Sequence, residues 1–326
     1  MNILFVKLSS LGDVVHAMPA LQDIRQALPQ ARIDWVVESA FAPLVERCDG
    51  VVRVIGCELR RWRSAPLSTQ TRGEWRAFRD ELRCEAYDAV IDLQGLTKSA
   101  LVARLARLAP FGRRHALANQ TEGSSYEAPT RWVAHAAHRI GPHVHAVQRS
   151  RELCALALGY ALPVTLHYGL QARGDRAATN TVVFVHGSSR EDKSWPEAHW
   201  LDLGRRLLAQ GRSIGLPHGS DAERERAACL AGQLGPRAEV WPRLDIGALA
   251  DRLGGSAGVI GVDSGLSHIA VALDRPHVQI YNFDTAWRTG PQAPSAGSEP
   301  RQVSVFDRPT PTVDAVWSAW QRVSAA

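Results

Sequence analysis

The chain has 326 residues, of which 45% are hydrophobic and 22% are charged, with a formal net charge of +5 and a pI near 9.2. This length predicts two globular domains, and the composition excludes a largely disordered chain. No apolar run approaches the ~20 residues that would cross a bilayer, and no secretory signal is present, so we expect a cytoplasmic protein. The basic charge indicates an acidic partner without deciding between nucleic acid, lipid headgroup and a small anion.

Cysteine and histidine spacing gives no sign of a disulfide framework or of structural zinc. Arginine far outnumbers lysine in this chain: of the 38 basic residues, only Lys7, Lys98 and Lys193 are lysine. An ammonium group is a compact point charge that a planar guanidinium replaces poorly. These three lysines are therefore candidates for a specific chemical task, with chance retention as the alternative.

Short runs rich in Val and Ile alternate with helical patterns along the whole chain. In the first half we predict strands at 3–7, 33–38, 51–55 and 89–93, with helices near 14–28, 73–86 and 98–108. In the second half we predict strands at 182–186, 214–217, 239–241, 258–262 and 277–281, with helices near 197–210, 221–234, 245–253 and 265–273. Strands that are apolar on both faces and alternate with helices indicate a doubly wound parallel sheet. Each half is expected to be an α/β, Rossmann-like domain.

A polar segment, "QARGDRAATNT" at 171–181, is typical of a linker and places the domains at 1–170 and 171–308. The tail has prolines suited to a helix start, followed by Val313, Val316 and Trp320 at helical spacing. We expect this final helix, within 309–326, to pack back on the N-terminal domain. Two such domains would face a central cleft, where ligands commonly bind.

The first turn, within "KLSSLGDVVHAMPAL" at 7–21, follows the first predicted strand. A dinucleotide site would have GxGxxG here, but "SSLGD" has one glycine, and Asp13 would set negative charge against a pyrophosphate. Nicotinamide binding is therefore excluded, although Glu38 stands where a ribose-binding acid would be. Two interpretations of Asp13 remain open: a helix N-cap, or a general base whose pKa is raised by burial.

The turn after the first strand of the second half, "HGSSREDKSWP", is suited to an anion. It offers free backbone amides, the hydroxyls of Ser188 and Ser189, and the rare Lys193 ahead of a helix start. These groups predict one side of a diphosphate site.

A second turn, "GVDSGLSHIA" at 261–270, also leads from a strand into a helix. Its positive helix end presents the amides of Ser264, Gly265 and Leu266. The alternative is that Asp263 is simply an N-cap, with His268 in the core or at the cap. Because no DxD motif occurs in the chain, we expect cationic side chains and helix dipoles, rather than a metal, to neutralise a leaving group.

Six ordered motifs carry a family resemblance: "VKLSSLGDVVHAMPAL", "IDWVVE", "RRWR", "YDAVIDLQGLTKSA", "EDKSWPEAHW" and "VDSGLSHIAVALDRP". Together they resemble the lipopolysaccharide heptosyltransferase I family of GT-B glycosyltransferases, nearly end to end. The resemblance implies an inverting, metal-independent enzyme without a cofactor that moves heptose from ADP-heptose to Kdo of the lipid A inner core. It also implies a peripheral position on the cytoplasmic face of the anionic inner membrane.

The resemblance further implies residue roles. Asp13 corresponds to the catalytic base, with Lys7 close behind it on the strand. The donor and its diphosphate are expected at Ser188, Ser189, Lys193, Asp263, Ser264, Gly265, Leu266 and His268. Glu223 corresponds to the acid that holds the adenosine ribose, and the anionic acceptor would meet Arg60, Arg61 and Arg63. After the last predicted strand the family commonly has "YGPTDP", whereas this chain has "YNFDTAWRTGP", so the loop near the donor differs.

Two alternatives remain beside this hypothesis. One is another GT-B transferase, such as the enzyme that adds the second heptose. The other is a noncatalytic nucleotide or RNA binder, which the basic pI favours. The chain lacks the aromatic and basic platform of RNA-binding modules, so no nucleic-acid partner is expected.

Overall fold

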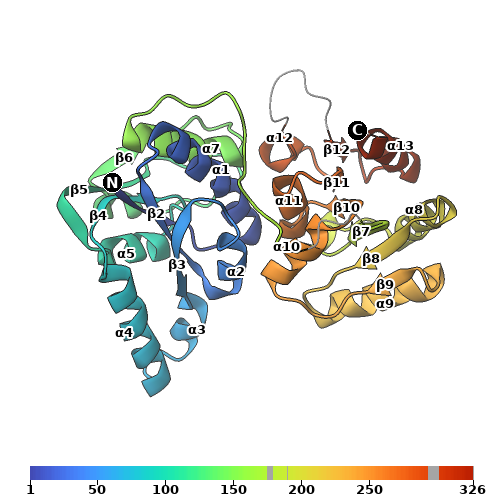
Figure 1. The fold of residues 1–326 in the computed structure, drawn as a ribbon, viewed down its shortest axis with the longest axis horizontal. Helices are drawn as coiled ribbons and strands as arrows, with labels where there is room; N and C mark the ends of the chain where they lie inside the picture. Colours follow the sequence, from blue (N-terminus) through green and yellow to red (C-terminus); the bar gives the residue numbers. More distant parts are fainter. Residues whose placement is uncertain (175–178, 189, 293–300, 326) are drawn as a thin grey trace. The chain divides into compact units, whose positions relative to one another are not determined.

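Each half of the chain forms one six-stranded, entirely parallel sheet (Figure 1). The structure is a computed structural model that describes residues 1–174, 179–188, 190–292 and 301–325. It divides into two units, Met1–Val164 and Thr165–Ala326. The predicted α/β class with two Rossmann-like domains is confirmed.

The first unit has strand order β3-β2-β1-β4-β5-β6. Its elements are β1 (Asn2–Val6), α1 (Leu11–Ala27), β2 (Arg32–Glu38), η1 (Ser39–Phe41), α2 (Ala42–Val45), β3 (Val51–Cys57), α3 (Leu59–Ser64), α4 (Thr69–Arg83), β4 (Tyr87–Asp92), α5 (Thr97–Leu105), β5 (Leu108–Leu117), α6 (Thr130–Val133), β6 (Ala136–His138) and α7 (Ala146–Leu158).

The second unit has strand order β12-β11-β10-β7-β8-β9. Its elements are β7 (Thr181–Val185), η2 (Glu191–Lys193), α8 (Glu197–Ala209), β8 (Ser213–Leu216), α9 (Asp221–Leu234), β9 (Ala238–Val240), α10 (Ile246–Gly254), β10 (Gly258–Val262), α11 (Gly265–Ala272), β11 (His277–Tyr281), α12 (Ala286–Thr289), β12 (Gln302–Phe306) and α13 (Val313–Ala325).

Both sheets are wound in the same way. In each unit the chain begins at a central strand, β1 or β7, adds strands on one side of it and then adds strands on the other side. The direction of winding reverses between β1 and β4 in the first unit, and between β7 and β10 in the second. At such a switch point the connections leave the carboxyl edge of the sheet in opposite directions, and this is where ligands bind in open α/β sheets. Ligand-binding groups should therefore lie in the turns after β1 and β4 of the first unit and in those after β7 and β10 of the second unit.

All nine predicted strands are present, each within two residues of its predicted bounds. The sequence patterns missed β5, β6 and β12, and they missed α7 and the short helices α2, α3, α6 and α12. Residues of β5 such as Phe111 and Arg113 are exposed, so this strand lacks the continuous apolar run that marks a buried one. The predicted helix 98–108 therefore extended too far, over the start of β5.

The prediction that the final helix packs on the N-terminal domain is wrong. The apolar stripe of α13, including Val316 and Trp320, is buried in the core of the second unit with Val182 and Ile260. Gly258 makes room for it, since a Cβ there would lie 2.7 Å from the Trp320 indole. The Trp320 ring fills the space that Gly258 leaves on the sheet of the second unit, and this fixes α13 on β10 and β11.

The boundary between the units also lies earlier than the predicted linker. Residues 165–172 already belong to the second unit, where Ala172 packs against Gly254 and the Arg173 amide donates to Asp251 Oδ1 at 2.6 Å. Residues 175–178 of the predicted linker lie outside the described residues. Within the ranges that the structure describes, no helix combines the length and apolarity needed to cross a membrane.

Trp320→Ala should destabilise the second unit by roughly 3–5 kcal/mol, the usual cost of truncating a buried tryptophan. Hydrogen exchange followed by mass spectrometry should show faster exchange in peptides covering β10 and β11, with β1 and β4 unchanged. Faster exchange confined to the first unit would instead place α13 on that unit and contradict the packing described above.

Candidate active site

At the carboxyl edge of the first sheet, Lys7 joins the two strands that flank the switch point. Its side chain is only 5% exposed, and Nζ donates to the carbonyl oxygen of Leu93, just after β4, at 3.1 Å. The same Nζ lies 3.8 Å from Asp13 Oδ1. A buried ammonium group thus lies directly behind the carboxylate.

Asp13 lies in the first turn of α1 and is 38% exposed, so a substrate can reach it. The N-cap of the helix is Ser10, whose backbone N–H and hydroxyl both donate to Asp13 Oδ2, at 3.2 and 2.9 Å. The interpretation of Asp13 as the N-cap is therefore wrong, although one of its oxygens supports the cap. The other oxygen, Oδ1, faces Lys7 and the Arg149 guanidinium, whose Nη2 lies 3.7 Å away.

The expected rise in the Asp13 pKa is also wrong. Burial alone would raise the pKa, but Lys7, Arg149 and the Ser10 hydrogen bonds outweigh it and leave the pKa below its ordinary value. The Lys7 pKa is lowered as well, chiefly by burial and despite the attraction of Asp13. At neutral pH, Asp13 is therefore an ionised carboxylate rather than a protonated acid.

Arg149, whose guanidinium faces Asp13, was not identified by the sequence analysis. It comes from α7, which packs along α1 and is fixed there by the buried Arg151–Asp23 pair, with Nε–Oδ2 at 2.7 Å. Arg149 Nη1 also donates to Thr121 Oγ1 at 3.1 Å. The only sequence signal was the abundance of arginine, which does not distinguish this position from the others.

Two more side chains organise the turn after β1. Gln94 Oε1 accepts the Leu8 amide at 2.8 Å, and Lys98 Nζ donates to Ser9 Oγ at 3.2 Å. Lys98 is the second of the three rare lysines, and Lys7 is the first. Both lie at the same turn.

The third lysine, Lys193, spans the switch point of the second unit. It lies in the turn between β7 and α8, and its Nζ donates to Oδ2 of Asp263, just after β10, at 2.6 Å. Here the burial is reversed: Lys193 is 21% exposed and Asp263 only 7%. This pair therefore presents its ammonium group, whereas the pair in the first unit presents its carboxylate.

Asp263 is held by three further groups on its other oxygen. His268 Nε2, Gln279 Nε2 and Thr289 Oγ1 each lie 3.4 Å from Oδ1. Burial would raise the Asp263 pKa, but His268 and Lys193 outweigh it and keep the pKa far below its ordinary value. Gln279 and Thr289 were not identified from sequence, and Thr289 comes from the loop in which this chain departs from the family pattern.

The helix start after Asp263 has the expected form. The N-cap of α11 is Ser264, so the N-cap interpretation of Asp263 is wrong as well. The amides of Ser264, Gly265 and Leu266 belong to the first turn, whose N–H groups have no partner within a helix. Ser264 Oγ is buried and has no hydrogen-bond partner in the described part of the chain.

Ser188 and Glu223 lie at the turn after β7. Ser188 is half-buried after β7, and its Oγ accepts the Arg190 amide at 3.4 Å, whereas Ser189 lies outside the described residues. Glu223 completes a capping box on α9, with Oε2 accepting the Gly219 amide at 2.6 Å. Its Oε1 lies over Gly187, where an added Cβ would come within 2.2 Å. Gly187 thus lets Glu223 approach the backbone of the turn after β7.

Comparisons with known proteins agree with this geometry. The family model "Glycosyltransferase family 9 (heptosyltransferase)" matches residues 75–307. The chain belongs to glycosyltransferase family 9.

Several relatives are similar over most of their length. Lipopolysaccharide heptosyltransferase 1 of Escherichia coli K12 is 43% identical over 289 residues, which cover 86% of this chain and 88% of the relative. The Pseudomonas aeruginosa PAO1 protein of the same name is 42% identical, covering 89% and 81%. The solved structure of E. coli heptosyltransferase WaaC with ADP matches with a TM-score of 0.86 and 36% identity, covering 98% of both chains. The GT-B type of this family 9 member follows from that match.

The arginines of the basic segment, Arg60, Arg61 and Arg63, differ in their ion pairs. Arg61 pairs with Glu74 and lies 3.6 Å from Glu58, so its charge is already compensated. Arg60 and Arg63 are exposed on α3. Burial raises the pKa of Glu38, and the charges of Lys98 and Arg60 offset only part of that rise. The three arginines are therefore not equivalent as anion-binding groups.

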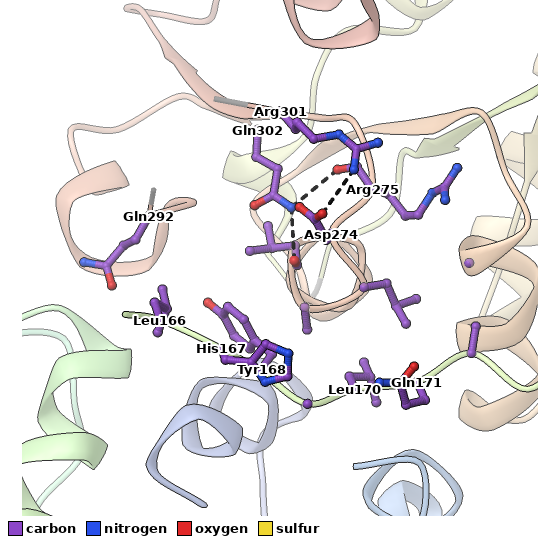
Figure 2. A pocket seen from close by; sticks show the side chains of 16 residues that line it. Leu166, His167, Tyr168, Leu170, Gln171, Asp274, Arg275, Gln292, Arg301 and Gln302 are labelled. Atoms are coloured by element: carbon purple, nitrogen blue, oxygen red, sulfur yellow. Dashed lines mark hydrogen bonds and ion pairs between the residues drawn. The ribbon is translucent and has the colours of Figure 1, made fainter. Parts of the chain in front are cut away.

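A separate cavity of 510 Å³ lies in the second unit, at the amino ends of β11 and β12 (Figure 2). Figure 2 shows Arg301 and Asp274, which pair at 3.1 Å, on one side and His167 and Tyr168 on the other. This edge is opposite to the one that carries Lys193. Because ligands of parallel α/β sheets bind at the carboxyl edge, the cavity is not the family 9 active site.

Among the described residues, no group of three or more His, Cys, Asp or Glu side chains could hold a metal ion.

Arg149→Gln should shift the acid limb of the pH profile of kcat/KM to higher pH. Removing a cation that faces Oδ1 raises the Asp13 pKa, so the carboxylate is lost to protonation at a higher pH than in the parent. Arg76→Gln, an exposed arginine on α4, is the matched control and should leave the profile unchanged. An acid limb that does not move with Arg149→Gln would show that Asp13 does not set it.

Proposed function

We propose that this protein transfers heptose from ADP-heptose to the Kdo residue of the lipid A inner core, as the enzyme that adds the first heptose. The observation that carries the proposal is the reversed burial of the two lysine–aspartate pairs. The first unit presents an ionised carboxylate, which can accept the proton of a hydroxyl that attacks an anomeric carbon. The second unit presents a cation and the start of a helix, which can stabilise the negative charge of a departing diphosphate.

The assignment to the first heptose rests on similarity. Identity to heptosyltransferase 1 of E. coli K12 is 43%, whereas identity to heptosyltransferase 2 of the same organism is 25% over 304 residues. The E. coli WaaC structure with ADP-2-deoxy-2-fluoro heptose is 38% identical, with a TM-score of 0.81 and 98% of both chains covered. That relative binds a close analogue of the proposed donor.

In the proposed reaction Asp13 removes the proton from the acceptor hydroxyl as its oxygen bonds to the anomeric carbon. The bond from that carbon to the diphosphate breaks on the opposite face, and ADP leaves, so the configuration inverts in one step. Lys193 and the amides at the start of α11 meet the negative charge that develops on the leaving group. In this proposal Lys193 and the α11 amides, rather than a divalent cation, neutralise the leaving group. Glu223 binds the ribose of ADP, and Ser188 contacts the phosphates.

The test is an assay of ADP-heptose with a Kdo-bearing lipid A acceptor in the presence of EDTA, with the product detected by mass. We expect one added heptose, and a loss of about 10²-fold or more in Asp13→Asn, the usual size of a general-base contribution. Asp80→Asn, an exposed position on α4, is the control and should keep full activity. Transfer only to an acceptor that already has one heptose would identify the second-heptose enzyme, and normal turnover in Asp13→Asn would remove the proposed base.

We also propose that the first unit contacts the anionic inner membrane through β5 and α6, which pack against each other. Phe111 and Trp132 expose almost their whole side chains there, and Arg113 and Arg131 beside them in sequence are exposed as well. Aromatic rings that enter the headgroup region and arginines that attract anionic lipid are suited to reversible membrane binding.

Replacing both aromatic residues, Phe111→Ser with Trp132→Ser, should reduce co-flotation with vesicles rich in phosphatidylglycerol and leave kcat on a soluble acceptor unchanged. The exposed Leu67→Ser, on the chain between α3 and α4, is the control. Equal flotation of the parent with neutral vesicles, or undiminished flotation of the double variant, would contradict the proposed surface.

A further inference from the structure

Glu38 has no role in the transfer described so far, yet it lies at the same edge of the sheet as the proposed base. It is the last residue of β2, which pairs with β1, and its backbone N–H donates to the carbonyl oxygen of Leu8 at 3.1 Å. The side chain thus stands at the same carboxyl edge of the sheet as the turn of Lys7 and Asp13, one strand away.

The carboxyl group of Glu38 is buried without being satisfied. The residue is 8% exposed, and Oε1 is fully buried with no hydrogen-bond partner in the described part of the chain. A buried polar atom without a partner costs free energy, and almost all such atoms in native proteins are paired. A group that stays unpaired in the free protein at the edge of a binding site is suited to pair with a ligand.

The surroundings of Glu38 are cationic. Burial raises the pKa of Glu38; Lys98 and Arg60 pull it down without cancelling that rise, and Glu58 adds to it. Lys98 Nζ also donates to Ser9 Oγ at 3.2 Å. Neither cation forms an ion pair with Glu38 within the ranges that the structure describes. Two cations therefore lie near the carboxyl, with one opposing carboxylate, while Oε1 is left without a hydrogen-bond donor.

We propose that Glu38 is a specificity residue whose Oε1 accepts a hydrogen bond from a nonreacting hydroxyl of the acceptor sugar. A polyhydroxylated sugar acid fits this place because its hydroxyl satisfies Glu38 and its carboxylate balances Lys98 and Arg60. A site built to pair with a substrate hydroxyl rejects an analogue without it, because the buried carboxyl is then left unpaired. This inference rests on the proposed function, since it names the substrate group read by the same site.

The test combines Glu38→Ala with acceptors that each lack one nonreacting hydroxyl. With the complete acceptor, Glu38→Ala should lower kcat/KM by about 10- to 100-fold, the size of a hydrogen bond to a charged group, with the KM for ADP-heptose unchanged. One deoxy acceptor should lose a similar factor with the parent enzyme. With that acceptor, Glu38→Ala should cause no further loss, because both changes remove the same contact.

Two further variants test the proposed role of Glu38. Glu85→Ala removes a carboxylate just before β4, at the opposite edge of the same sheet, and should change nothing. Glu38→Gln keeps the shape and an accepting oxygen, so it should fold and lose less than Glu38→Ala on the complete acceptor. If Glu38→Ala does not fold, the same comparison is made with Glu38→Gln.

The outcomes separate this inference from the proposed function. No transfer by the parent enzyme to any Kdo acceptor would remove the proposed function itself. Transfer by the parent together with undiminished activity of both Glu38 variants would overturn only the role of Glu38. A loss of the same factor on every acceptor, or a raised KM for ADP-heptose, would make Glu38 a structural residue and would also overturn the inference.

Discussion

A lysine–aspartate pair lies at the switch point of each sheet, and the way each pair is buried determines what it can do. In the first unit the ammonium group is enclosed and the carboxylate is partly exposed, with Lys7 5% and Asp13 38% exposed. In the second unit the carboxylate is enclosed and Lys193 is the more exposed partner. The same two residue types therefore present opposite charges to a substrate from one repeated topology.

This arrangement explains why depressed carboxyl pKa values serve both halves of the reaction. Asp13 stays ionised because Lys7, Arg149 and Ser10 outweigh its burial, and an ionised carboxylate is ready to accept a proton. Asp263 stays ionised because His268 and Lys193 outweigh burial, so it can hold Lys193 in place as a cation. In the proposed reaction, the carboxylate of the first unit is the reacting group, and the carboxylate of the second unit positions a cation.

The sequence predicted the elements that are buried on both faces, since a continuous apolar run identifies a central strand wherever it packs. It did not predict β5, in which no residue before His115 is fully buried. It also did not predict the docking of α13, because a helical stripe shows that a helix is buried without showing on which sheet. The motifs located Asp13, Lys193 and Asp263, since strand ends at a switch point are fixed by local pattern. Arg149 is distant in sequence and unmarked, and the pKa of Asp13 depends on it, so both required the three-dimensional contacts.

The most direct test of this division of labour is a comparison of ADP affinity, by calorimetry, in Lys193→Met and Lys7→Met. Each change removes one ammonium group from one pair and keeps a side chain of similar length. If the second unit binds the departing nucleotide, Lys193→Met should weaken ADP binding about 10-fold or more, as expected for losing a charge-assisted contact, and Lys7→Met should bind ADP like the parent. Weakened binding in Lys7→Met with normal binding in Lys193→Met would place the diphosphate on the first unit and contradict the account.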